Sequence, residues 1–249
     1  MPPALHVVRA GTGPRVLLIH GSAADHTTWS IQLAGPLPAQ LSLIAYDRRA
    51  DALSVEAHAD DAVGLLASDP TPVLVAGSSF GAVVALDAVR RYPDRFRGAI
   101  LIEPPMAASD DALAAPREFL AEYDRTVASA GGPAAAELFL RMVLGAAVFE
   151  RMPRVYQERS KAKWAEIRAD SHALIAYRPR YPELSSVQVP VQLLGGERSA
   201  AYFRPTLETL LAALPDARLE IIAGAGHMLH AEAHRRFAEV VLAFAASLA

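Results

Sequence analysis

The sequence predicts an α/β fold with a mostly parallel sheet that is covered on both faces. Apolar runs of strand length alternate with helical patterns in residues 1–106 and again in 187–249. This alternation is typical of parallel sheets with helices on both sides. The runs are continuously apolar, as expected for strands with both faces buried. Residues 107–186 break the rhythm, since they carry helical patterns and no convincing strand.

Each strand and helix of the predicted sheet region has its own local signal. The expected strands are short β-branched or leucine-rich runs, at residues 4–8, 15–20, 41–46, 72–77, 98–103, 189–196 and 218–224. The expected helices between them cover 29–37, 55–67, 80–91, 203–214 and 234–248. The turn RAGTGP separates the first two strands and favours a hairpin between them. Pro93 is expected to end the helix that precedes it.

The helical stretch at 107–186 is expected to form a cap. Its helical segments are PREFLAEYDRTVAS, PAAAELFLRMVLG and PRVYQERSKAKWAEIRA. An insertion between two strands of a parallel sheet lies over the carboxyl ends of the strands, where α/β proteins bind ligands. The predicted organisation is therefore a core made of 1–106 and 187–249, with a cap at 107–186.

Composition narrows the class of protein. The chain has 249 residues, of which 52% are hydrophobic and 20% charged, as in one large globular domain. Its net charge of −3 favours neither nucleic acid nor an anionic membrane as a partner. Cysteine is absent, which excludes disulfides, thiolate nucleophiles and cysteine metal sites. Neither a signal peptide pattern nor an apolar run of membrane-spanning length is found, so a cytoplasmic location is expected.

A nucleophile motif stands where a predicted strand ends and a helix begins. Gly77-Ser78-Ser79-Phe80-Gly81 has the form G-x-S-x-G, with Ser79 at its centre. In a nucleophile elbow this serine lies on a tight strand-to-helix turn that exposes its hydroxyl. The flanking glycines are expected to permit the strained turn. Small residues at such a junction also have a structural explanation, namely close packing, but the position of the motif favours catalysis.

A serine hydroxyl needs a base that takes its proton. Of the eight histidines, His227 is best placed, in a loop after the last expected strand and before the final helix. His230, one helical turn further on, is the alternative. Five others are predicted to be surface or helix residues: His6, His26, His58, His172 and His234.

The segment LLIHGSAADHTTW is a candidate for binding a negatively charged oxygen. A strand is expected to end at His20, and Gly21 lets the chain turn so that backbone N–H groups face the crevice. The N–H groups of Ser22 and Phe80 are the expected oxyanion donors. Taken alone, the segment is explained equally well as an ordinary turn that contains a glycine.

With these motifs in order, the chain resembles the α/β-hydrolase superfamily over nearly its whole length. HGS resembles the oxyanion loop of the family, GSSFG matches its elbow and GAGHMLH resembles its histidine loop. YDRRADALS is similar to the D-x-R-G-x-G-x-S segment, with Ala50 and Ala52 in place of both glycines. The resemblance implies an α/β-hydrolase fold with a helical cap inserted after the strand that ends at Glu103.

The acid departs from the pattern common in this family. Many members carry an aspartate in a G-x-x-D loop, where this chain has Ser199. The other position used in the superfamily follows the strand after the nucleophile helix, and here it is occupied by Glu103. That arrangement resembles the fungal zearalenone lactonases and their relatives. Glu103 also ends an apolar strand, an unusual place for an unpartnered carboxylate. Glu103 is the expected acid, and Glu197 is the alternative.

The resemblance implies a cofactor-free serine hydrolase of carboxylic esters, with lactones a favoured subset. Ser79 is expected to attack the carbonyl carbon, with His227 as the base and Glu103 as the acid that orients it. Neither an organic cofactor nor a metal is expected, because the sequence has no Cys/His cluster with ligand spacing and no phosphate-binding glycine loop.

The substrate is left open. Aromatic residues of the cap favour a small hydrophobic ester or lactone, and Trp164, Tyr177 and Met228 are candidate contacts. One alternative keeps the fold for lyase, carbon–carbon hydrolase or cofactor-free oxygenase chemistry. Another is a receptor-like protein that binds a ligand without turning it over. The oligomeric state is not indicated by the sequence.

Overall fold

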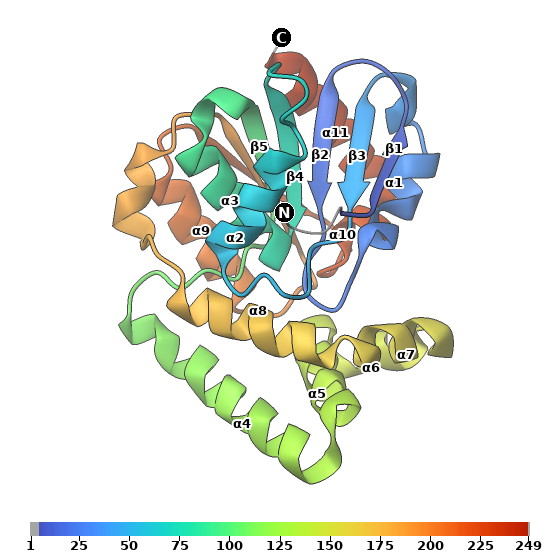
Figure 1. Ribbon diagram of the computed structural model, residues 1–249, viewed down its shortest axis with the longest axis vertical. Coiled ribbons are helices and arrows are strands. Elements are labelled where there is room, and N and C mark those ends of the chain that lie inside the picture. Colours follow the sequence, from blue (N-terminus) through green and yellow to red (C-terminus); the bar gives the residue numbers. More distant parts are fainter. Residues whose placement is uncertain (1–4, 249) are drawn as a thin grey trace.

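A computed structural model describes residues 5–248 and contains a seven-stranded sheet with helices on both faces (Figure 1). The strand order is β1-β3-β2-β4-β5-β6-β7, and neighbouring strands are parallel except for the antiparallel pair β1 and β3. This confirms the predicted α/β fold class. The strands are β1 (Val7–Ala10), β2 (Arg15–Ile19), β3 (Ser42–Tyr46), β4 (Val73–Ser78), β5 (Phe96–Ile102), β6 (Val191–Gly196) and β7 (Ala217–Ile222).

Helices follow the strands as the sequence predicts, with small shifts at their ends and one short helix, α10, where a loop was expected. Those around the sheet are α1 (Ser30–Ala34), α2 (Val55–Gly64), α3 (Phe80–Arg91), α9 (Phe203–Ala213), α10 (Leu229–Glu232) and α11 (His234–Ser247). Short 3-10 turns are η1 (His26–Trp29), η2 (Leu37–Ala39), η3 (Pro93–Arg95), η4 (Asp111–Leu113) and η5 (Tyr181–Ser186). The single helix expected at 29–37 is instead η1, α1 and η2, because Gly35 and Pro36 interrupt it.

The predicted hairpin between the first two strands is wrong. β1 pairs with β3, where Val7 lies opposite Tyr46, and not with β2. Both edges of β2 are already occupied, since β3 and β4 pair with it in parallel. The glycine-rich turn therefore carries the chain past β3, and β1 becomes the edge of the sheet.

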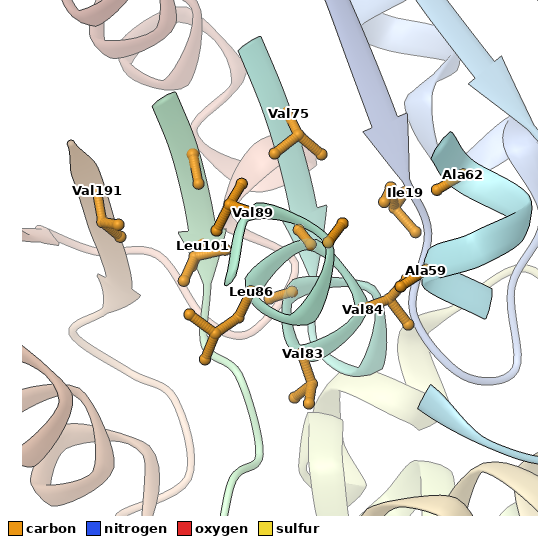
Figure 2. Close-up of a cluster of buried hydrophobic side chains, with 14 of the residues drawn as sticks. Ile19, Ala59, Ala62, Val75, Val83, Val84, Leu86, Val89, Leu101 and Val191 are labelled. Carbon is orange, nitrogen blue, oxygen red and sulfur yellow. The ribbon is translucent and has the colours of Figure 1, made fainter. Parts of the chain in front are cut away.

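Side chains of successive strand residues enter two separate cores. In β2, Leu17 and Ile19 join the cluster that contains residues of α2, α3 and α9. Val16 and Leu18 point the other way and join the cluster that contains residues of α11. Such alternation follows from the strand period of two. Figure 2 shows part of the first cluster, with Ile19 of β2 and Val84 of α3 among its labelled side chains.

The segment between β5 and β6 forms helices and 3-10 turns, as predicted. Its helices are α4 (Ala114–Ala130), α5 (Gly132–Leu144), α6 (Ala146–Arg151), α7 (Arg154–Ala162) and α8 (Trp164–Ala176). A continuous helix expected at 153–169 is divided into α7 and α8 at Lys163. These helices lie beyond the carboxyl ends of the strands, with α8 between the sheet and α4 (Figure 1). That this cap is a domain with bounds 107–186 stays a prediction.

Over residues 5–248, each helix is too short or too polar to cross a lipid bilayer.

Candidate active site

The nucleophile motif forms a sharp turn between β4 and α3. Ser79 has φ 55° and ψ −123°, a conformation that is costly for a residue with a side chain. From Val73 to Val89 every residue is buried except Ser79, which is half-buried. The turn therefore brings one residue, the predicted nucleophile, toward the surface of an otherwise buried strand and helix.

The two glycines that flank the motif are required for close packing. A Cβ on Gly77 would overlap the carbonyl oxygen of Gly81, and a Cβ on Gly81 would overlap that of Ile19. The positive φ belongs to Ser79 itself, and neither glycine has one. The expectation that the glycines permit the strained backbone is thus corrected: they allow strand and helix to approach each other while the serine carries the strain.

A buried histidine and a buried carboxylate meet beside this turn. Nδ1 of His227, in the loop between β7 and α10, lies 2.6 Å from Oε2 of Glu103, which follows β5. A carboxylate at Nδ1 leaves Nε2 as the nitrogen able to accept a proton. The His227 ring also stacks on Phe203, with ring centroids 4.6 Å apart and planes 13° from parallel. Both contacts restrict the orientation of the imidazole.

Glu103 is anchored on the sheet by further hydrogen bonds. The N–H of Gly196 donates to Oε1 at 2.7 Å, and the N–H of Glu103 donates to the carbonyl of Leu194 at 3.1 Å. A φ of 44° turns Glu103 out of the strand direction. The N–H of Ser79 donates to the carbonyl of Ile102 at 2.8 Å. The predicted nucleophile and the predicted acid are therefore both tied to the end of β5.

The alternative acid lies elsewhere. Glu197 is exposed, and its Oε2 accepts a hydrogen bond of 2.7 Å from the N–H of Gly224. Ser199 has a buried Oγ without a hydrogen-bond partner in the described part of the chain. A cavity of about 300 Å³ adjoins both residues and Glu103, with Arg204 also in its lining. The small side chain of Ser199 contributes to this space, since an aspartate there would fill part of it.

The alternative base is a core residue. The ring of His230 is fully buried, with its centroid 4.7 Å from that of Trp29 and 6.3 Å from that of Phe237. Burial, with a smaller effect of His227, lowers the pKa of His230 to about 3. Its ring is therefore neutral at pH 7 and packs as part of the hydrophobic interior.

The HGS segment lies directly against the elbow. A Cβ on Gly21 would lie 2.9 Å from the carbonyl oxygen of Ser78 and 3.0 Å from Cβ of Ser79. Phe80 is the first residue of α3, and the first N–H groups of a helix have no partner inside the helix. The backbone segments that carry Ser22 and Phe80 thus both adjoin Ser79. That their N–H groups bind an oxyanion stays a prediction.

The three predicted substrate contacts have different environments. Tyr177 is buried, and its hydroxyl donates to Oδ1 of Asp87 at 3.1 Å, so it belongs to the interior beneath α3. Trp164 is half-buried and packs against Gly132 inside the cap. Met228 is half-buried at the start of α10. The contacts of Tyr177 and Trp164 are structural, and a substrate contact by any of the three stays a prediction.

Arg48 and Asp170 adjoin the site although the sequence analysis did not single them out. They form a buried ion pair next to Gly21 and Ser22. One signal in the sequence could have identified Asp170. It lies three residues after Ile167 and three before Ala173, and all three are buried on one face of α8. A carboxylate on an otherwise apolar helix face needs a partner when buried.

The fold also brings together a group of potential metal ligands that sequence spacing did not reveal. In residues 5–248, the ligand atoms of His6, His26 and Asp47 lie within 4.8 Å of one another. Nδ1 of His26 is already 2.8 Å from Oδ1 of Asp47. This hydrogen bond explains the grouping without an ion, so we assign it no metal. The expectation that the protein requires neither metal nor cofactor stays a prediction.

The sheet order, the cap and the elbow between β4 and α3 define the class of protein. The model of the Alpha/beta hydrolase family matches residues 16–240, and the chain belongs to this family.

The individual proteins that this chain is similar to share only a modest part of its sequence. The uncharacterized hydrolase YraK of Bacillus subtilis (strain 168) is 36% identical over 111 residues, which is 40% of this chain and 41% of that protein, less than half of its length. Carboxylesterase YbfK of the same organism is 23% identical, over 96% of this chain and 83% of the length of that protein. The enol-lactonase from Burkholderia xenovorans LB400 has a TM-score of 0.82 at 21% identity, over 97% of this chain and 96% of its own. At this identity the structural likeness shows the fold alone.

Proposed function

We propose that this protein is a serine hydrolase that cleaves a carboxylic ester or lactone of a small hydrophobic molecule through an acyl-enzyme. The proposal is carried by the 2.6 Å contact between His227 and Glu103, together with the strained and partly exposed Ser79. Similarity to a carboxylesterase over most of the chain supports ester cleavage as the reaction class. The proposal involves no metal and no organic cofactor.

The proposed reaction uses five residues. Oγ of Ser79 attacks the carbonyl carbon while Nε2 of His227 takes the hydroxyl proton. Glu103 accepts the hydrogen bond from Nδ1 and stabilises the imidazolium that results. N–H groups of Ser22 and Phe80 donate to the oxyanion. His227 then protonates the leaving alkoxide, and a water molecule, activated in the same way, releases the carboxylic acid and restores Ser79.

Glu103 is the acid in this proposal. Its place after the strand that follows the nucleophile helix resembles the place of the acid in the zearalenone lactonases. Its support is twofold. Oε2 of Glu103 is the carboxylate oxygen at Nδ1 of His227, whereas the carboxylate of Glu197 is bonded to the N–H of Gly224. A carboxylate in contact with Nδ1 is the arrangement that keeps the correct tautomer of the base.

The test compares two adjacent serines. Ser79→Ala should abolish labelling by a fluorophosphonate and lower turnover of aryl esters by at least about 10³-fold. Ser78→Ala is the matched control, because Ser78 is buried in β4, and it should retain both. Esters of graded chain length and lactones are assayed together, after exhaustive chelation, to identify the substrate class.

Three outcomes contradict the proposal, and a fourth favours an alternative. Labelling that maps to Ser78 would make that residue the nucleophile. Substantial turnover by Ser79→Ala would indicate chemistry that uses His227 as a base without a serine nucleophile. Activity that disappears on chelation and returns with zinc would contradict the absence of a metal. Near-stoichiometric binding of a ligand with no turnover would favour the receptor-like alternative.

A further inference from the structure

A second buried charged pair joins the cap to the core beside the proposed oxyanion site. Nη1 and Nη2 of Arg48 donate to Oδ1 and Oδ2 of Asp170 at 3.0 and 2.8 Å, a two-pronged contact across 122 positions of the sequence. The side chains are 6% and 5% exposed. Arg48 follows β3, whereas Asp170 belongs to α8, the cap helix that lies nearest the sheet (Figure 1).

Arg48 contacts both backbone segments that carry the proposed oxyanion donors. Its Nη2 also donates to the carbonyl of Gly21 at 3.2 Å, immediately before Ser22. Its guanidinium carbon lies 4.5 Å from the ring centroid of Phe80. The backbone N–H of Arg48 donates to Nε2 of His20 at 3.1 Å. One residue therefore touches the start of the HGS segment, its glycine and the first residue of α3.

Asp170 contacts the same loop directly. The hydroxyl of Ser22 donates to Oδ2 of Asp170 at 2.7 Å. This hydrogen bond runs through the side chain of Ser22, so it leaves the backbone N–H of that residue free to donate elsewhere. A carboxylate from the cap thus holds the residue whose N–H is proposed to bind the oxyanion.

A neutral histidine completes the surroundings of Arg48. Burial, together with the nearby charge of Arg48, lowers the pKa of His58 to about 3. The ring is therefore neutral at pH 7. Because a guanidinium can only donate, Nε2 of His58 accepts a hydrogen bond of 3.1 Å from Nη1 of Arg48. Nη1 and Nη2 of Arg48 are held by acceptors from α2, α8 and the HGS segment, which gives the guanidinium a defined position.

Stability alone is a weak reason for this pair. Removing two charges from water costs free energy that their attraction only partly returns, and well-packed apolar residues often replace such pairs without loss of stability. An ion pair gives each of its hydrogen bonds a defined direction, whereas an apolar pair makes no hydrogen bonds. In this molecule those directions end on Gly21 and Ser22.

We propose that Asp170 and Arg48 are positioning residues that hold the HGS segment in its catalytic geometry, so that the docking of α8 on the core sets the rate of acyl transfer. The proposal rests on the proposed function, because it assigns the backbone of Ser22 to the oxyanion. The cap then has a part in the chemical step in addition to covering the substrate.

The first test is Asp170→Asn, assayed per active site titrated with a fluorophosphonate. An oxyanion contact strengthens in the transition state, so its displacement should lower kcat by roughly 10- to 100-fold and leave KM within about twofold. Asp124→Asn is the matched control. Asp124 of α4 pairs with Arg168, which lies on α8 like Asp170, but this pair is at the surface. It should change kcat by less than about twofold. An unchanged kcat in Asp170→Asn, or a rise in KM alone, would overturn the proposal.

A second variant separates positioning from folding. Arg48→Met combined with Asp170→Leu removes both charges and fills the space, so it should fold with a Tm near that of the wild type. Its kcat per titrated site should nevertheless remain as low as that of Asp170→Asn. Recovery of wild-type kcat in this apolar variant would show that any packed contact suffices, and the proposal would be wrong.

The last arm tests the route through Ser22. Ser22→Ala keeps the backbone N–H but removes the hydroxyl that binds Asp170. It should lower kcat on its own and have little further effect in the Asp170→Asn background, as for two residues that act through one contact. Full additivity would contradict the route. Ser79→Ala is assayed beside these variants. If Ser79→Ala stays active, the proposed function fails. If Ser79→Ala is inactive but Asp170→Asn keeps wild-type kcat, only this inference fails.

Discussion

Two buried carboxylates at the carboxyl ends of the strands have partners with opposite chemistry. Glu103 is bonded to His227, and Asp170 is bonded to Arg48. An imidazole gains and loses a proton near neutral pH, whereas a guanidinium keeps its charge. The first pair is therefore suited to moving a proton, and the second is suited to holding atoms in place. Burial alone does not distinguish these roles, but the partner does.

The two pairs also differ in the part of the chain that supplies them. Glu103 and His227 both come from segments that follow strands, β5 and β7. Asp170 comes from a cap helix and Arg48 from the end of β3. In the proposed enzyme the sheet carries the proton transfer, while the geometry of the oxyanion site is shared between sheet and cap. Variants of both pairs should therefore lower turnover, but by different amounts.

The largest effect is expected at the proton-moving pair. Glu103→Gln keeps the shape of the side chain but removes the charge that fixes the tautomer of His227, so turnover should fall by about 10³–10⁴ with the fold intact. Glu197→Gln, the matched control in the neighbouring loop, should cost less than about tenfold. Turnover of aryl esters measured under identical conditions decides between them. A large loss at Glu197 with a near-silent Glu103 would move the acid to the later loop.

Most of the sheet could be predicted because its signals are local. Apolar runs, the glycines of GSSFG and the carboxylate at the end of an apolar strand each lie within a few neighbouring residues. The pairing of β1 with β3 could not be predicted, since it depends on which edges of β2 remain free. The contact between Arg48 and Asp170 joins positions that are 122 residues apart, and the local sequence around one residue gives no sign of the other as its partner. The same holds for His6, His26 and Asp47, which only folding brings together.

A smaller effect is expected when the positioning pair keeps its charge but loses its geometry. In Arg48→Lys a point charge replaces the planar fork, so the contacts to both oxygens of Asp170 and to the carbonyl of Gly21 cannot all form. We expect kcat per titrated site to fall roughly tenfold while KM stays nearly constant. Steady-state kinetics with one aryl ester provides the measurement. Wild-type kcat in this variant would show that charge alone is sufficient.

The cap should affect selectivity more than the chemical step. Trp164→Leu removes an aromatic ring from the cap, and we expect the ratio of kcat/KM between short and long acyl chains to change by about 10-fold. Labelling of Ser79 by the fluorophosphonate should remain intact, because Ser79, His227 and Glu103 all lie outside the cap, on segments that follow strands of the sheet. Equal changes for all substrates would instead agree with the packing of Trp164 against Gly132 as a purely structural contact.

The smallest effect on catalysis is expected at His230, which differs from His227 in having no charged partner within residues 5–248. Because the pKa of His230 is about 3 when folded and near 6.5 when unfolded, the unfolded chain binds one more proton between these values. The free energy of unfolding therefore falls as the pH drops through this window, by up to about 1.4 kcal/mol per pH unit for this residue. His230→Leu should remove that contribution, flatten the pH dependence of stability in urea unfolding and keep activity at pH 7 within about threefold.

His172→Gln, at an exposed histidine, is the control and should leave the slope of stability against pH unchanged. Identical slopes for wild type and His230→Leu would mean that His230 is not neutral in the folded protein, and collapse of activity at pH 7 would make it the base in place of His227.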